Sequence, residues 1–449
     1  MAQRVPADGP TPSNAMAPLT AAERRAVIDT VAAQLTRFYA LADTGRLIAE
    51  RLRQRLAAGA YDTIGSRRQF ADVVTADMKS INGDRHLSLG LASNAPTVPT
   101  GLPALPPLGL RPRGDDAPVP AEILAASRRN NFGIGRVEVL PGNVGYLEFR
   151  NFDPLPQART AVASALALVQ HADALIIDVR EHMGGSGVLS NFVISHFVGP
   201  DTVPVLTVAV RAAQQHETRY TLREVPGPRR PEVPLYVLTS RGTVSAGEDF
   251  AFVLKNLGRA TLVGETTAGA GRNNVQVDAG HGFTASISVS TVTDPRSGRE
   301  WEGVGVVPDL AVPPRTALTI AHAHAARALA RTAAGTRRRD LELTAEFVEA
   351  RARSRQVPAS TLQRYVGTYG GERSISLEHG ALVFRRYPER LGQPLVPLSD
   401  SVFALGPLVR LAFERDGATL HLRATANVGE SMRWSRTGPP PRIASEYDE

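Results

Sequence analysis

Ser245 is the residue whose surroundings are best suited to chemistry. It follows an apolar run, Leu235 to Thr239, and a polar turn, and it precedes a helical pattern that ends at Gly258. A second short strand, Ala260 to Val263, completes a strand–turn–helix–strand unit. Ligands of such sheets gather at the carboxyl ends of the strands, where free N–H groups and the positive helix end favour a developing anion. Ser245 is therefore a candidate nucleophile.

The same serine has a purely structural alternative. Ser245-Ala-Gly-Glu248 is a capping box, in which Ser caps the helix and Glu reaches back to its N–H. Helix caps are far commoner than nucleophiles, so the local sequence alone favours the cap. The rest of the chain has to decide between the two roles.

A glycine-rich turn between Arg180 and Gly187 is a second candidate element. It follows Ala174 to Val179, a run typical of a strand buried on both faces of a parallel sheet, and precedes a helix over Val188 to Phe197. The glycine spacing matches neither the dinucleotide fingerprint nor a Walker A loop. Such a turn can bring bare N–H groups close to a substrate oxygen, although an ordinary strand-to-helix turn explains it equally well.

Two further reactive side chains stand at the junctions of predicted elements. His86 follows a turn, where a lone His is usually an exposed surface residue. Glu302 follows Trp301 and precedes an apolar run, where burial without a partner would raise its pKa; a surface Glu is the alternative. His322 and His324 lie two residues apart on a predicted helix and face different sides, so they make a poor metal pair.

Composition rules out several classes of function. The 449 residues contain no Cys, which excludes a thiol nucleophile, a disulfide framework and a Cys-based zinc site. The net charge of +7 comes from scattered Arg, so nucleic-acid binding is not expected. No run of eighteen apolar residues exists, so stable membrane insertion is not expected either. The first nineteen residues lack the apolar core of a secretory signal, and Ser-Asn-Ala before Met16 indicates a tag remnant or an alternative start.

The predicted elements divide the chain into six segments. The first helix opens at the capping box Thr20-Ala-Ala-Glu23, and short strands and turns fill the stretch from Leu362 to Arg436. We expect a disordered N-terminal segment (1–19), an N-terminal helical domain carrying His86 (20–90), a Pro-rich linker or loop (91–130), an α/β core (131–315), a helical linker (316–358) and a C-terminal β module (359–440).

Four ordered segments resemble the C-terminal processing peptidase superfamily of serine peptidases. They read GDRHL at 83–87, IIDVREHMGG at 176–185, YVLTSRGTVSAGEDFAFVLKNLGRATLVGETTAGAG at 236–271 and WEGVGVVPDLAV at 301–312. They look most similar to the branch that contains the tricorn protease core and interphotoreceptor retinoid-binding protein. The resemblance implies an α/β fold with a crotonase/ClpP-like superhelical core, a C-terminal small β-barrel or sandwich module, and neither a metal nor an organic cofactor.

The resemblance also implies a role for each candidate residue. It makes Ser245 the nucleophile, His86 of GDRHL the general base, and Glu302 of WEGVG the acid that supports the polar network. A serine nucleophile needs a base within reach, and that base benefits from an orienting carboxylate.

The family's oxyanion hole maps to two backbone N–H groups of this chain. One belongs to Gly185, or alternatively to Gly184, and the other belongs to Ala246, the residue after the candidate nucleophile. Two such N–H groups can converge on one substrate oxygen, which is the geometry that acyl transfer requires.

We therefore predict a serine peptidase that cleaves peptide or unfolded-protein substrates through an acyl-enzyme, secreted or periplasmic if the resemblance extends to its compartment. The tail-specific branch of the superfamily uses Ser and Lys, with the Lys in a Gly-Lys-Gly turn, and the resemblance places that turn at 269–271, which reads Gly-Ala-Gly here. A Ser–Lys mechanism is therefore not expected, and Lys255 lies about 15 Å along the helix from Ser245. The alternative function is a non-catalytic binding protein for an apolar ligand on a peptidase-derived scaffold. An acyl-CoA enzyme is disfavoured, because no basic nucleotide-binding stretch stands out. Substrate preference and oligomeric state stay open.

Overall fold

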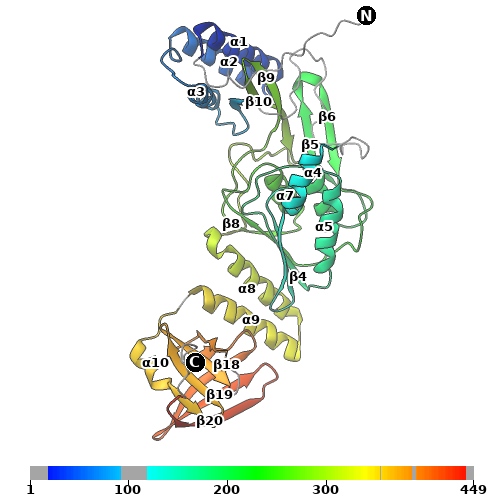
Figure 1. The fold of residues 1–449 in the computed structure, drawn as a ribbon. Helices are drawn as coiled ribbons and strands as arrows, with labels where there is room; N and C mark the ends of the chain where they lie inside the picture. The colour runs from blue at the N-terminus through cyan, green and yellow to red at the C-terminus, as the bar shows by residue number, and fades with distance from the viewer. Residues whose placement is uncertain (1–18, 93–118, 354, 387–390, 441–449) are drawn as a thin grey trace, which may run out of the picture.

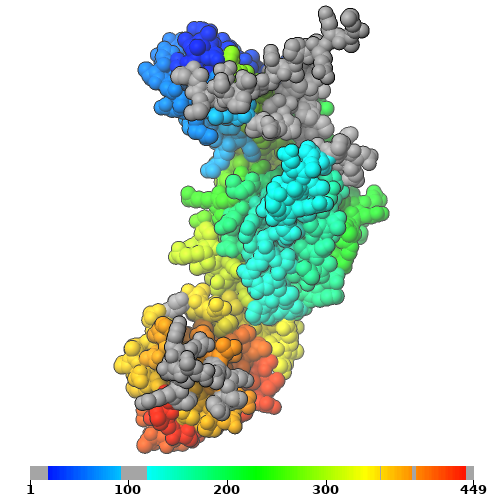
Figure 2. Space-filling model, viewed as in Figure 1, coloured from blue at the N-terminus to red at the C-terminus, as the bar shows by residue number. Residues whose placement is uncertain are grey.

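The computed structural model describes residues 19–92, 119–353, 355–386 and 391–440. These residues form three parts along an elongated molecule, with the N-terminal helices at one end and the C-terminal strands at the other (Figure 1). Figure 2 shows the same succession of parts in space-filling form. In the described residues, no helix has both the length and the apolar character that a membrane crossing requires. Most of the predicted N-terminal segment and linker lies outside the described residues.

The N-terminal part contains three helices and one strand: α1 (Ala21–Phe38), α2 (Ala42–Ala57), α3 (Arg67–Lys79) and β1 (Ser88–Leu91). α1 begins at the predicted capping box, where the Glu23 N–H donates to Thr20 Oγ1 and the Thr20 N–H donates to Glu23 Oε2. The apolar faces of all three helices pack into one buried cluster.

A five-stranded sheet joins these helices to the rest of the chain. Its strands follow the order β1-β10-β5-β6, and β9 pairs with β10. The later strands are β5 (Pro204–Val210), β6 (Gln215–Tyr220), β9 (Asn273–Gly280) and β10 (Phe283–Thr293), with a 3-10 turn, η3 (Arg211–Ala213), between β5 and β6. Buried side chains of β9 and β10 complete the core of the N-terminal helices, so this core draws on two distant stretches of sequence.

A six-stranded sheet with the order β11-β8-β7-β4-β3-β2 forms the centre of the molecule. Its strands are β2 (Ile134–Leu140), β3 (Val144–Phe149), β4 (Ala174–Asp178), β7 (Leu235–Thr239), β8 (Thr261–Gly264) and β11 (Leu310–Ala311). All neighbours are parallel except β2, which is antiparallel to β3. β4 is buried along its whole length, as its continuous apolar sequence predicted.

Helices cover both faces of this sheet, which gives the α/β layering predicted from the sequence. The central helices are α4 (Ala121–Arg129), α5 (Gln157–Leu168), α6 (Gly187–Ser195), α7 (Ala246–Asn256) and α8 (Pro314–Thr332), with a 3-10 turn, η2 (Asn131–Gly133). Buried residues of α5, α6 and α7 pack on one face, and Ala317, Ala321 and Ala325 of α8 pack on the other.

The C-terminal part is a nine-stranded antiparallel sheet that is nearly closed into a barrel. It follows α9 (Gly335–Arg353) and α10 (Ala359–Tyr365), and its strands are β12 (Gly367–Tyr369), β13 (Arg373–Glu378), β14 (Ala381–Arg386), β15 (Gln393–Pro394), β16 (Val396–Pro397), β17 (Val402–Ala404), β18 (Val409–Asp416), β19 (Thr419–Ala426) and β20 (Ser431–Gly438). The predicted fold class, with N-terminal helices and a C-terminal β module, is confirmed. The exact domain boundaries stay a prediction.

Candidate active site

Ser245 lies between β7 and α7, at the end of the sheet where the parallel strands finish. Its φ of 53° and ψ of −116° fall outside the regions that non-glycine residues normally adopt. The turn before it is tied to the segment after β4, because Ser240 Oγ donates to the Arg180 carbonyl oxygen at 2.5 Å and Thr243 Oγ1 donates to that of Val179 at 2.7 Å. A strained backbone persists only where its surroundings hold it, and such strain is frequent at functional sites.

Glu248 has a larger role than the capping box that the sequence predicted. Its buried carboxylate accepts four hydrogen bonds, from the N–H groups of Ser245 (2.9 Å), Gly269 (2.6 Å) and Ala270 (2.8 Å) and from the Thr267 hydroxyl (2.6 Å). Burial raises the pKa of Glu248, and these bonds oppose the rise. The Glu248 N–H donates to the Ser245 carbonyl oxygen at 2.8 Å, so Glu248 anchors the main chain of Ser245.

The glycine-rich turn after β4 packs directly on Ser245. A Cβ atom at Gly184 would lie 3.1 Å from Ser245 Cβ, and one at Gly185 would lie 2.1 Å from the Phe152 carbonyl oxygen. The φ angles of Gly184 and Gly185 are +101° and +123°, which side chains disfavour. Space and backbone conformation therefore both require glycine at 185, and at 184 the backbone conformation favours glycine while an added Cβ would press on Ser245.

Two backbone N–H groups at this junction, those of Gly185 and Ala246, donate to no protein acceptor in the described part of the chain. The Gly184 N–H, the alternative from the sequence, donates instead to Nδ1 of the buried His182 at 3.1 Å. Burial lowers the pKa of His182 to about 3, so its ring is neutral and Nδ1 stays an acceptor. The geometry thus favours Gly185 over Gly184 as the partner of Ala246.

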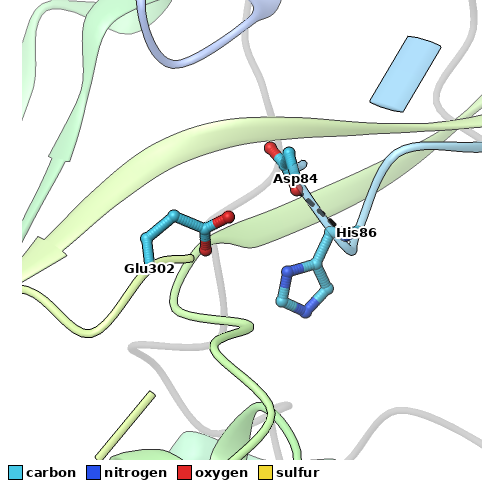
Figure 3. A group of neighbouring side chains, drawn as sticks. All are labelled: Asp84, His86 and Glu302. Atoms are coloured by element: carbon cyan, nitrogen blue, oxygen red, sulfur yellow. Dashed lines mark hydrogen bonds between the residues drawn. The ribbon is translucent and has the colours of Figure 1, made fainter. Parts of the chain in front are cut away.

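His86 and Glu302 lie together although they are far apart in the sequence. Figure 3 shows one ring nitrogen of His86 on the side that faces Glu302. One ligand-type atom from each of Asp84, His86 and Glu302 lies within 4.8 Å of the other two. His86 Nδ1 is buried without a partner among the described residues. His86 is therefore not the exposed surface residue that a lone His at a turn usually is.

Arg272 is the centre of an ion-pair network next to His86 that was not predicted from the sequence. Arg272 Nη1 lies 2.9 Å from the Tyr39 hydroxyl, 3.2 Å from Asp84 Oδ2 and 3.8 Å from Glu302 Oε1. The Tyr39 hydroxyl donates to Asp84 Oδ2 at 2.8 Å. The main-chain N–H of His86 donates to Asp84 Oδ1 at 2.9 Å. Asp84 belongs to the GDRHL segment, but no local pattern marks its distant partners.

The surroundings shift the pKa values of His86 and Glu302 in opposite directions. Burial lowers the pKa of His86, and Arg272 lowers it further while Asp84 opposes this. Burial raises the pKa of Glu302 to about 7, Asp84 adds to the rise, and Arg272 and the Gly271 N–H oppose it. Near pH 7, where the Glu302 carboxyl is about half ionised, the imidazole is therefore mostly neutral.

The loop at 269–271 joins the cluster around Ser245 to the cluster around His86. Gly269 and Ala270 donate to Glu248, and the next N–H, that of Gly271, donates to Glu302 Oε2 at 2.6 Å. Among the described residues, neither ring nitrogen of His86 forms a hydrogen bond with Ser245 or any other group. The structure thus brings Glu302 to His86 and the glycine turn, through Gly184, to Ser245, and one loop connects the two clusters.

The spacing of Asp84, His86 and Glu302 would also suit a metal ion. Arg272 already supplies the positive charge there, because its guanidinium lies within 4 Å of both carboxylates. His322 and His324, set aside as a metal pair by their spacing, bond separately to the Pro141 carbonyl oxygen and the Tyr236 hydroxyl. The donor set therefore fits an Arg-neutralised polar network better than a cation site.

Two stretches of the chain match domain models that both bear the name of one peptidase family. Residues 143–312 match peptidase family S41, and residues 18–109 match the N-terminal domain of peptidase S41 in eukaryotic IRBP. The first match contains Gly185, Ser245 and Glu302, and the second contains His86. The family resemblance predicted from the sequence is confirmed.

The individual relatives share low sequence identity with this chain, and only over part of its length. The chain is 30% identical over 38% of its length to a carboxyl-terminal-processing protease of Synechocystis sp., and 26% identical over 44% of its length to the carboxy-terminal processing protease CtpB of Bacillus subtilis. It spans only 38% of the length of each of these curated relatives. A solved lipoprotein structure from Streptococcus agalactiae shares 15% identity, with 67% of this chain and 93% of that chain covered and a TM-score of 0.43.

Proposed function

Residues 143–312 form a peptidase family S41 domain, and on that premise we propose that this chain is a serine peptidase that cleaves peptide bonds through an acyl-enzyme. The observation that carries the proposal is the packing of Ser245 against the glycine turn, next to the unpartnered N–H groups of Gly185 and Ala246. A serine beside two free N–H donors is the arrangement that acyl transfer needs.

In the acylation step, Ser245 Oγ attacks the carbonyl carbon of the substrate peptide bond. The carbonyl oxygen becomes an oxyanion, which accepts hydrogen bonds from the N–H groups of Gly185 and Ala246. His86 takes the hydroxyl proton and returns it to the leaving amine as the C–N bond breaks. Water, deprotonated by His86, then attacks the Ser245 ester; the acyl group leaves as a carboxylic acid, and His86 returns its proton to Ser245 Oγ. This step requires His86 to reach Ser245, directly or through one water, when substrate is bound.

Glu302 supports the imidazolium that forms on His86 during both steps. The cluster of Asp84, His86 and Glu302, with the unpartnered Nδ1 of His86, supports this role. A carboxylate near the imidazolium stabilises its charge and its orientation. Since burial raises the pKa of Glu302 to about 7, this support grows as the pH rises through neutrality.

Peptides and unfolded protein segments are the proposed substrates. The oxyanion donors are main-chain N–H groups that recognise a carbonyl oxygen and no particular side chain. The relatives are named for carboxyl-terminal processing, but the turn at 269–271 of this chain contains no Lys. We therefore propose cleavage by Ser245 and His86 and no Ser–Lys mechanism.

Release of fluorescent peptides from labelled unfolded casein tests this function. Wild type should hydrolyse casein, Ser245→Ala should lose at least about a thousandfold in rate, and Ser164→Ala, a change at an exposed helix position, should keep the full rate. Hydrolysis that persists in Ser245→Ala overturns the assignment. A wild type that is inert towards casein yet binds an apolar ligand tightly favours the binding-protein alternative.

A further inference from the structure

Arg219 is a charged residue with a largely buried side chain that the proposed mechanism does not use. It lies on β6, and its side chain is 9% exposed. Its Nη2 donates to Asp249 Oδ1 at 2.5 Å, and its Nη1 donates to the Gly187 carbonyl oxygen at 2.8 Å. One guanidinium therefore holds the first turn of α7 and the start of α6 at the same time.

Each of these contacts lies beside one of the proposed oxyanion donors. Gly187 follows Gly185 by two residues along the glycine turn. The Asp249 N–H donates to the Ser245 carbonyl oxygen at 2.9 Å, and this carbonyl belongs to the same planar peptide group as the Ala246 N–H. The Glu248 N–H donates to the same carbonyl oxygen at 2.8 Å, so the positions of Glu248 and Asp249 together determine where the Ala246 N–H points.

The ion pair fits between the two helix starts without spare room. A Cβ atom at Gly187 would lie 2.8 Å from Arg219 Nη1 and 3.1 Å from Asp249 Oδ2. Burial raises the pKa of Asp249, and the charge and hydrogen bond of Arg219 oppose that rise. Without the guanidinium, the buried carboxylate must take up a proton or move towards water, and either change disturbs the start of α7.

We propose that Arg219 is a positioning residue that fixes the separation between the Gly185 and Ala246 N–H groups. This inference rests on the proposed function of these two donors. They bind the oxyanion more strongly than the ground-state carbonyl, so an error in their spacing weakens binding of the transition state and spares binding of the uncleaved peptide. The β5–β6 hairpin would thereby take part in the active site from outside the central sheet.

The test compares Arg219→Met and Arg219→Lys with a matched control, Arg259→Met. Arg259 also anchors backbone carbonyl groups, those of Phe197, Arg230 and Val233, but away from the glycine turn. Arg219→Met should lower kcat/KM by about 100-fold and weaken inhibition by a peptide boronic acid, a tetrahedral adduct mimic, by a similar factor. Arg219→Lys keeps the charge, but an ammonium group cannot bond to Gly187 and Asp249 at once as the guanidinium does. Its kcat/KM should therefore lie between those of Arg219→Met and the wild type.

Binding of the uncleaved peptide separates positioning from general damage. In a Ser245→Ala background, Arg219→Met should leave the Kd of the substrate peptide within about threefold of its parent value. Equal losses in peptide binding and in boronic acid binding, or a kcat/KM of Arg219→Met close to that of Arg259→Met, would overturn the inference.

Amide hydrogen exchange tests the positioning role of Arg219 independently of peptidase activity. An inert wild type that forms no boronic acid adduct would refute the peptidase proposal. Even then, Arg219→Met should speed exchange in the segments 184–190 and 244–250 relative to Arg259→Met if the guanidinium holds both. Unchanged exchange in these two segments would refute the positioning role by itself.

Discussion

Arg272 and Asp84 form a buried ion pair in which Nη1 lies 3.2 Å from Oδ2. Arg272 precedes β9 and follows the loop that contacts Glu248 and Glu302, whereas Asp84 lies in the turn that carries His86. The pair thus joins the part that holds Ser245 to the N-terminal helical part. Breaking a buried pair leaves an uncompensated charge, which makes this contact a strong determinant of where His86 lies.

Asp84→Asn should reduce the free energy of unfolding by about 3 kcal/mol, because Arg272 loses its nearest carboxylate. It should also shift the acidic limb of the kcat/KM profile to lower pH, since the Asp84 charge raises the pKa of Glu302. Urea unfolding and a pH–rate series measure the two effects. Asp43→Asn is the control, because the Asp43 side chain is 85% exposed. An Asp84→Asn variant as stable as this control would contradict the role of the pair.

Glu302→Gln should change the pH dependence of catalysis. In the wild type, kcat/KM should rise as the pH passes through about 7, where the Glu302 carboxylate ionises. The Gln variant should lose that step and retain only the step of His86, which lies below the usual 6.5 because burial lowers the pKa of His86. A pH–rate series from 5 to 9 measures this, and an unchanged step near 7 in the variant would assign the step to another group.

The stability of the same variant provides an independent check. Between pH 4.5 and about 7, the folded wild type holds a proton on Glu302 that the unfolded chain has released. The free energy of unfolding should therefore fall over this range, by about 3 kcal/mol in total. When the pH is raised from 4.5 to 8, the free energy of unfolding of Glu302→Gln should fall by about 3 kcal/mol less than that of the wild type. Parallel stability curves for the two proteins would contradict the raised pKa.

Gly185→Ala should abolish most activity and destabilise the protein. A Cβ atom there would lie 2.1 Å from the Phe152 carbonyl oxygen, so the turn must move and its N–H must shift with it. The loss of one oxyanion donor lowers kcat by about 100-fold. Gly298→Ala is the matched control, because its φ is also positive, +67°, but no atom lies within 4 Å of the added Cβ. It should lose only about 1 kcal/mol of stability and keep its activity.

Glu248→Ala should destabilise the protein by at least about 3 kcal/mol, because it leaves three main-chain N–H groups and the Thr267 hydroxyl without their acceptor. Urea unfolding measures the loss. Glu342→Ala, which removes an exposed i,i+4 pair with Arg338, should change stability by less than about 0.5 kcal/mol. Similar values for the two variants would show that Glu248 is no more than a helix cap.

The unit around Ser245 was predictable because its signals are local. A β-rich run, a turn and a helical period lie within thirty residues, and the structure places β7, α7 and β8 within about one residue of the predicted limits. The β5–β6 hairpin was not predicted, since its second strand, QHETRY, has no apolar alternation and is mostly exposed.

The long-range contacts could not be predicted from periodicity or spacing. Arg272 shows no local pattern, and its contacts with Asp84, Tyr39 and Glu302 exist only once β9 and β10 pack against the N-terminal helices. Glu248 was visible only as a cap, because three of its four donors lie in the turn at 267–270 and are brought close by tertiary structure. The catalytic roles of Ser245, His86 and Glu302 remain proposals for experiment.

Intact-protein mass spectrometry after exposure to a fluorophosphonate probe tests the central claim most directly. Wild type should gain one adduct that peptide mapping places on Ser245, and Ser245→Ala should gain none. His86→Ala should react at least about 100-fold more slowly, because the hydroxyl has lost its base. An adduct of equal yield in Ser245→Ala, or full-rate labelling in His86→Ala, would contradict the assignment of these two residues.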